Sequence, residues 1–388
     1  MQEQSFIARP PLWLAAGAVA AGWGAVYTTA RFIFAFAGDA IHLDTVITYV
    51  AAEAGLRYGW SRMYDVATLR ALASPFRIPV DSTSMYINTP MWAWLLTPLT
   101  TVSEPTAYAL WSILSLVALV WAWYVAAPYA GVAKLTTLLV ALALWPVLTS
   151  FYFGQPVMVL LALVAAGWWL CAHERPLAAG AAFALATVLK PHMVILVPLA
   201  LLVSGRYRPF IGWLAGCAGL GMAILVALGP SGLINWWEAL KYVEGHSANA
   251  HYTLGGQIGL GPATYALLAL QAAAALVIAH RRRSELEIVV AVGILGCVSA
   301  AYYIHQADYS MLVLAAWLLL RTSPPMWHRL WLLVGFVTMQ VVTTEVVAPQ
   351  LIWDACWLGL LAISSFSGSG VSAPATPREA ASAAHEGT

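Results

Sequence analysis

Long apolar runs separated by short polar segments dominate this chain. A helix needs about 17–25 apolar residues to cross a bilayer core of ~30 Å. The strict two-residue alternation of membrane barrels is absent. The pattern therefore predicts an all-α polytopic membrane protein with about twelve transmembrane helices. We place these at residues 11–37, 107–127, 134–150, 156–173, 176–190, 191–204, 209–229, 258–279, 287–303, 308–321, 327–345 and 348–363.

Two stretches fit this pattern poorly. Residues 86–100 are apolar but only about fifteen long, and they include Pro90 and Pro98, so we expect a re-entrant or interfacial segment. If this segment crossed the membrane completely, the orientation of all later spans would be inverted. The runs 176–190 and 191–204 each give only ~21 Å of helix. We interpret them as a helical hairpin with Lys190 at its tip, because one long span would move the next arginine cluster to the other face.

Basic residues cluster in the turns on one side of the predicted spans, which the positive-inside rule makes the cytoplasmic side. These clusters are Arg9, Lys134, 173–175, 206–208, 280–283 and 321–329. Both termini are then cytoplasmic in a multi-pass plasma-membrane protein. We expect a transmembrane domain at 1–363, with a long external first loop at 38–106 and a second external loop at 230–257. Residues 364–388 are rich in Ser, Ala, Gly and Pro and predict a disordered cytoplasmic tail.

Composition agrees with the membrane assignment. The 388 residues are 61% hydrophobic and 9% charged, whereas soluble domains are about a quarter charged. The net charge is +1 without a basic patch, so no nucleic-acid partner is predicted. The four cysteines lie in apolar stretches without metal-ligand spacing. We predict neither a metal site nor a cofactor.

Two aspartates follow the first predicted span. A carboxylate just outside a span can take the proton of a hydroxyl group, but an aspartate at such a boundary often caps a helix instead. Asp39 and Asp44 point in different directions on a helix, so a close pair is not expected. We assign capping to Asp39 and catalysis to Asp44.

Two cations lie in apolar surroundings. Lys190 has apolar sequence on both sides, and a buried ammonium without an anion is costly, so a phosphate is its natural partner. The alternative is that its side chain reaches up to the interface. Arg31, near the outer end of the first span, has the same two interpretations, and there the interfacial one is favoured.

Further candidates lie in the external turns. His305, with Tyr302, Asp308 and Tyr309 three or four positions away, suits hydrogen bonding to a sugar or phosphate, although a structural role is as easily argued. Possible substrate contacts that stand more alone are Gln155, His192, Tyr49, His251 and Asp308. The aromatic residues around His251 fit a headgroup belt at least as well as a sugar site.

Several short motifs follow one another along the chain, and their order is informative. They are 44–55, Met63-Tyr64-Asp65, Asn88-Thr89-Pro90, Thr97-Pro98-Leu99, Phe153 to Met158, Leu189-Lys190-Pro191-His192 and His305 to Tyr309. In this order they resemble the polyprenol-phosphate-mannose-dependent mannosyltransferases, glycosyltransferase family 87, of the C-type membrane fold. Each motif is short, and their order is the stronger signal.

The resemblance implies a polyprenyl-phosphate sugar donor, a glycolipid or glycan acceptor, an external active site and inversion at the anomeric carbon. It implies Asp44 as the base and Lys190 and His305 as ligands of the donor phosphate. Where the family tends to have an Asn-x-Ser-like segment, this chain has 251–256, which leaves the acceptor open.

Two alternatives remain from the sequence. A lipid-linked oligosaccharide ligase would use outer arginines for a pyrophosphate donor, and this chain has Arg57, Arg62, Arg70 and Arg77 in its first external loop. A transporter would have internal repeats and broken spans at mid-membrane, and we find no convincing repeat.

Overall fold

The computed structural model describes residues 12–38, 43–76, 86–244 and 250–364. Within these ranges every regular element is a helix, which confirms the all-α prediction. The α-helices are α1 (Leu12–Ala37), α2 (Leu43–Tyr58), α3 (Val66–Ala73), α4 (Pro90–Leu96), α5 (Glu104–Ala126), α6 (Gly131–Ala143), α7 (Trp145–Phe153), α8 (Val157–Ala172), α9 (Pro176–Leu189), α10 (Leu196–Val203), α11 (Tyr207–Glu244), α12 (Leu254–Ile258), α13 (Pro262–Arg281), α14 (Leu286–Ser299), α15 (Met311–Arg321), α16 (Met326–Val341) and α17 (Ala348–Ile363). Short 3-10 helices are η1 (Trp60–Arg62), η2 (Ser74–Phe76), η3 (Thr97–Thr101), η4 (Pro191–Met193), η6 (Gln306–Ser310) and η7 (Val342–Thr344).

Several of these helices are suited to a bilayer. Three of the described helices, α5, α11 and α13, are long and apolar enough to cross, and α6 with α7 would make a fourth span bent by 59°. The apolar helices α8, α9, α14 and α17 are shorter. The protein is therefore an α-helical polytopic membrane protein, while the predicted number of about twelve crossings is not confirmed.

Prolines and glycines set the breaks in the apolar runs. The predicted span 134–150 bends between α6 and α7, where Pro146 stands in the first turn of α7 and cannot donate to the preceding helix. Gly229, with a φ of 59°, and Pro230 interrupt α11 where the predicted span ended. Pro191 likewise follows the last turn of α9, so the chain leaves the helix at Lys190.

The uncertain segment 86–100 does not form a spanning helix. It contains α4, whose seven residues give ~10 Å of helix, followed by η3. Trp92 and Leu96 of this segment are buried in the main core. The segment therefore packs on the bundle without crossing it, in line with the re-entrant or interfacial prediction.

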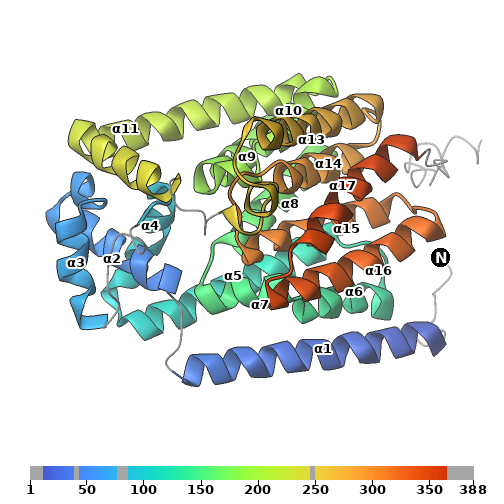
Figure 1. Ribbon diagram of the computed structural model, residues 1–388, viewed down its shortest axis with the longest axis horizontal. Helices are drawn as coiled ribbons and strands as arrows, with labels where there is room; N and C mark the ends of the chain where they lie inside the picture. Colours follow the sequence, from blue (N-terminus) through green and yellow to red (C-terminus); the bar gives the residue numbers. More distant parts are fainter. Residues whose placement is uncertain (1–11, 39–42, 77–85, 245–249, 365–388) are drawn as a thin grey trace, which may run out of the picture.

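The bundle has two distinct ends. In Figure 1, α1 and α11 run lengthwise along opposite flanks, and α2, α3 and α4 gather at the end away from the beginning of α1. The basic turns meet one another: Arg206 Nη1 donates to the Arg283 carbonyl at 2.6 Å, and His280 Nδ1 lies 2.9 Å from the Val203 carbonyl oxygen. The Arg321 guanidinium lies 4.8 Å from the Trp168 ring centroid.

The core lies between these ends. Helix α14 is buried along its whole inner stretch, residues 288–299, and packs against α10, α13 and α15. The polar motif segments follow or precede these buried helices at the end where α2 lies, so the rigid core fixes their positions.

Candidate active site

The turn after α7 brings Gln155 to α2. Gly154 has a φ of 70°, in the left-handed region that favours glycine. A Cβ at this position would lie 1.6 Å from Thr45 Oγ1, so α2 packs directly on the glycine backbone. Trp111 Nε1 donates to the Gly154 carbonyl at 2.9 Å. This close approach explains why the motif needs Gly before Gln.

Asp44 lies in the first turn of α2, where the helix dipole favours a negative charge. Gln155 Nε2 donates to Asp44 Oδ2 at 2.5 Å. The Asp44 side chain is partly exposed, whereas Gln155 is only 7% exposed. The carboxylate thus rests on a buried amide and remains open on its other side.

Lys190 lies beneath Gln155. Its Nζ donates to Gln155 Oε1 at 3.3 Å and forms an ion pair with Asp308 Oδ1. The lysine needs an acceptor and Asp44 needs a donor, so the orientation of the Gln155 amide is determined. Lys190 is buried, at 5% exposure, and does not reach for the interface. Its anionic partner within the protein is Asp308, an interaction that the sequence interpretation did not foresee.

His305 and Asp308 are held together by η6. The His305 backbone N–H donates to Asp308 Oδ2 at 2.9 Å, and Asp308 N–H donates to the His305 carbonyl at 3.0 Å. Tyr303 Oη lies 2.8 Å from His305 Nε2. Both carboxylate oxygens of Asp308 are thus used, one for Lys190 and one for the backbone of His305.

His192 completes the cluster from η4. Its ring meets that of Tyr303 edge to face, with 5.6 Å between centroids, and Tyr303 in turn meets His305 at 5.1 Å. Among the described residues, His192 Nε2 has no hydrogen-bond partner. This buried nitrogen is therefore a polar group of the cluster whose hydrogen-bonding capacity the described residues leave unused.

Burial and mutual charge set the protonation of the cluster. Burial raises the pKa of Asp44, although His305, then Gln155 and Lys190, pull it down. Burial lowers the pKa of His192 to about 4, and it also lowers the pKa of His305. Burial, the largest single effect, acts to raise the pKa of Asp308, but the Lys190 ammonium, the two histidines and the hydrogen bond from the His305 N–H together outweigh it, so the net direction is downward. At neutral pH His192 is therefore neutral, and Asp44 binds a proton more readily than a free aspartate.

Three predicted residues lie in other environments. Tyr49 Oη donates to the Val102 carbonyl at 2.9 Å, and the ring packs on Phe76. The Arg31 guanidinium lies 4.5 Å from the Trp145 ring centroid. His251 Nε2 lies 3.1 Å from Glu345 Oε2. Their proposed contacts with substrate stay predictions, and Asp39 lies outside the described residues.

Sequence reasoning missed the residues that connect this cluster. Asp308 was named for a possible substrate contact, yet it is the most buried member, at 0% exposure. Tyr303 was not singled out, although it touches both histidines. A signal existed for Asp308, since a buried lysine needs an anion and the sequence predicts this acid and Lys190 on the same side of the spans.

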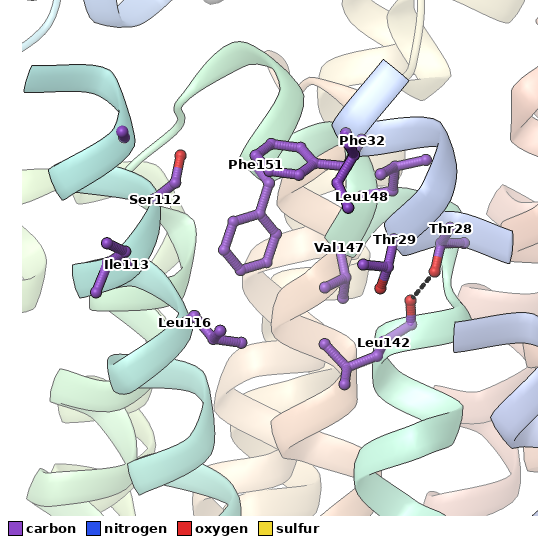
Figure 2. A pocket seen from close by; sticks show the side chains of 12 residues that line it. Thr28, Thr29, Phe32, Ser112, Ile113, Leu116, Leu142, Val147, Leu148 and Phe151 are labelled. Atoms are coloured by element: carbon purple, nitrogen blue, oxygen red, sulfur yellow. Dashed lines mark hydrogen bonds between the residues drawn. The ribbon is translucent and has the colours of Figure 1, made fainter. Parts of the chain in front are cut away.

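An apolar cavity of about 360 Å³ lies against α7, the helix that leads to Gln155 (Figure 2). Its walls come from α1, α5, α6 and α7, and they include Phe32, Ile113 and Phe151. Phe151 stands four residues before Gln155 on the same turn-and-helix unit. No residue of the 86–100 segment lines this cavity.

Comparison with protein families gives a match. The sequence profile of glycosyltransferase family 87 matches residues 86–343, about two thirds of the chain. The match includes Gln155, Lys190, His192 and 305–309, and it begins after Asp44. No curated protein and no solved structure matches the chain. The chain belongs to glycosyltransferase family 87 and is a membrane glycosyltransferase.

Proposed function

We propose that the protein transfers a hexose, specifically mannose, from a polyprenyl-phosphate donor to a glycolipid or glycan acceptor, with inversion, on the external face of the plasma membrane. The observation that carries the proposal is the partly exposed Asp44 carboxylate, held by the buried Gln155 and, through it, by Lys190. One carboxylate base with one free oxygen suits a reaction in which the acceptor displaces the phosphate from the sugar in a single step.

In the proposed step, Asp44 takes the proton of the acceptor hydroxyl while that oxygen forms a bond to the anomeric carbon. The bond from this carbon to the phosphate oxygen breaks, and polyprenyl phosphate leaves with the electron pair. Gln155 occupies Oδ2, so Oδ1 is the oxygen that we assign to the proton. A raised pKa of Asp44 supports this role because a stronger base removes the proton more readily.

The leaving phosphate gains a negative charge in this step, and the cluster offers donors for it. Two N–H groups of Lys190 are used by Asp308 and Gln155 within the described residues, which leaves the third. His192 Nε2 has no partner there, and the Tyr303 ring packs against both His192 and His305. Because Asp308 neutralises Lys190, the site would hold the phosphate through directed hydrogen bonds more than through net positive charge.

The apolar cavity supports a lipid-borne donor. It lies between α1 and α5 and adjoins the helix that leads to Gln155, and its lining is almost entirely hydrocarbon. An isoprenoid chain would bury apolar surface there while its phosphate reaches the polar cluster. The gathering of the basic turns at the other end supports an external active site.

The ligase alternative is weaker, because outer arginines that it would use have carboxylate partners. Arg57 forms an ion pair with Glu53, and Arg62 lies 3.9 Å from Asp65.

The test is a transfer assay with purified protein and radiolabelled mannose on polyprenyl phosphate, compared with nucleotide-linked mannose and with a lipid-pyrophosphate oligosaccharide. We expect transfer from the first donor alone, with the anomeric configuration of the product opposite to that of the donor. Transfer from either of the other donors alone, or retention of configuration, would overturn the proposal.

A further inference from the structure

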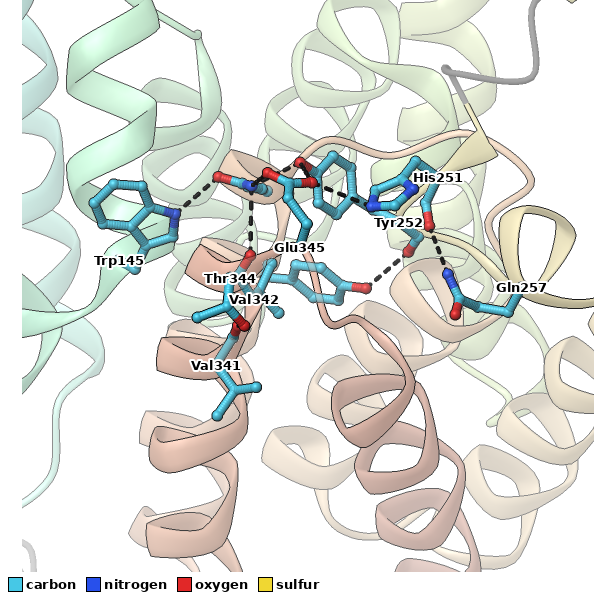
Figure 3. A network of polar contacts seen from close by, with 10 residues as sticks. Trp145, His251, Tyr252, Gln257, Val341, Val342, Thr344 and Glu345 are labelled. Atoms are coloured by element: carbon cyan, nitrogen blue, oxygen red, sulfur yellow. Dashed lines mark hydrogen bonds and ion pairs between the residues drawn. The ribbon is translucent and has the colours of Figure 1, made fainter.

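A second polar network lies next to the cluster (Figure 3). We call it the Glu345 network, and it consists of His251, Tyr252, Gln306 and Glu345. These residues come from three separate segments: the stretch before α12, the helix η6, and the turn between α16 and α17. It therefore joins parts of the chain that no local interaction would hold together.

Glu345 is the hub of this network. Its Oε1 accepts from Gln306 Nε2 at 3.1 Å, and its Oε2 accepts from Tyr252 Oη at 2.7 Å and lies 3.1 Å from His251 Nε2. The side chain is 59% exposed, so water could have satisfied it, yet both oxygens bind protein donors. Its backbone takes a φ of 64°, which is uncommon for a residue with a side chain.

Gln306 connects the Glu345 network to the active-site cluster. It directly follows His305 and stands two residues before Asp308 in the five-residue η6. Its Nε2 donates to Tyr252 Oη at 2.6 Å and to Glu345, while its Oε1 accepts from Trp145 Nε1 at 2.8 Å. Because its amide is bonded at both the nitrogen and the oxygen and the side chain is only 8% exposed, Gln306 cannot move without breaking these hydrogen bonds.

A second hydrogen bond joins the segment around Tyr252 to the same short helix, η6. Tyr309 Oη, on η6, donates to the Tyr252 carbonyl at 2.8 Å. The segment around Tyr252 is thus bonded to η6 at Gln306 and at Tyr309, on either side of Asp308. A short 3-10 helix has few hydrogen bonds of its own, so these side-chain bonds decide where it lies.

We propose that Glu345 is a positioning residue for the sugar transfer: through Gln306 and Tyr252 it holds η6 where Asp308 meets Lys190 and where His305 faces the donor. The catalytic part of this inference rests on the proposed function, whereas the positioning part does not.

Hydrogen exchange measured by mass spectrometry tests the positioning without any assay of activity. Wild type, Glu345→Ala and Glu238→Ala are compared in detergent. Glu238 is a matched control because it is 61% exposed and its ion-pair partner among the described residues is Lys241 on its own helix. We expect Glu345→Ala to speed exchange in residues 303–311 about tenfold, with the rest of the chain and the control unchanged. If Glu345→Ala exchanged at the wild-type rate in residues 303–311, or if its exchange increased equally along the whole chain, the inference would be overturned.

Transfer kinetics test the catalytic part. Glu345→Ala should lower kcat about tenfold and leave the KM for the acceptor unchanged, because the acceptor base Asp44 lies on α2. Gln306→Glu alone places two carboxylates together and should be equally slow. The double variant Gln306→Glu/Glu345→Gln restores their hydrogen bond with the roles reversed, and should recover most of the rate. A wild-type kcat for Glu345→Ala, or a double variant slower than either single one, would contradict the inference. Absence of transfer by the wild type would instead count against the proposed function.

Discussion

The buried ion pair between Lys190 and Asp308 makes the sharpest prediction about stability. The two side chains are 6% and 0% exposed, so neither charge can be taken up by water when its partner is lost. Removing one member of a buried pair costs about 3–5 kcal/mol. In Asp308→Asn the amide also cannot accept from both Lys190 and the His305 N–H, so one of these donors loses its acceptor. We expect the apparent melting temperature to fall by about 5–10 °C.

The assay is thermal unfolding of detergent-solubilised protein, followed by tryptophan fluorescence. Lys190→Met should also have a lower melting temperature than wild type, because it leaves Asp308 as an unpaired buried charge. Lys190→Met/Asp308→Leu leaves no charge behind and should melt above both single variants. Lys241→Met, which breaks the exposed pair with Glu238, should melt like wild type, because surface pairs contribute at most about 1 kcal/mol.

The double variant separates stability from catalysis. It should remain poorly active even where it is stable, because Gln155 loses the ammonium that orients it toward Asp44. If Asp308→Asn melted like wild type, or if the double variant melted below both single ones, the described coupling would be wrong.

Three further predictions concern the surroundings of the site. Gln155→Leu removes a hydrogen bond that lowers the pKa of Asp44, and since the base must be deprotonated, the acidic fall of kcat/KM should move to higher pH; an unchanged pH profile would refute this. Gly154→Ala should lower the melting temperature more than Gly205→Ala, because both have a positive φ but only Gly154 lacks space for a Cβ; equal effects would contradict the packing argument. Ile113→Trp should obstruct the apolar cavity and raise the KM for a long polyprenyl donor more than for a short one, and an equal rise for both donors would argue against a lipid chain there.

Much of the helical framework could be predicted from the sequence, because the long apolar runs are largely helical and some of their breaks fall at proline or glycine. The bend at Pro146 and the kink at Gly229 show what hydropathy alone misses. An apolar run shows which part of a chain is buried, whereas the missing N–H donor of a proline or the positive φ of a glycine decides where the helix is interrupted.

The site was predictable in part, for a different reason. Asp44, Lys190 and His305 could be named from motif order, but the sequence did not indicate that Lys190 meets Asp308, 118 positions away. Only packing of α9 against the bundle brings them together. Glu345 was invisible because an exposed acid between two spans looks like a solvated turn, and its partners come from two other segments.

The central claim is that Asp44 is the base of a transfer from polyprenyl-phosphate mannose. The most direct measurement is the single-turnover rate with this donor for wild type, Asp44→Asn and Glu53→Gln, the last being a carboxylate of the same helix that pairs with Arg57. We predict a loss of about 10²–10⁴-fold for Asp44→Asn with donor binding retained, and a near wild-type rate for Glu53→Gln. Equal rates for wild type and Asp44→Asn would contradict the account.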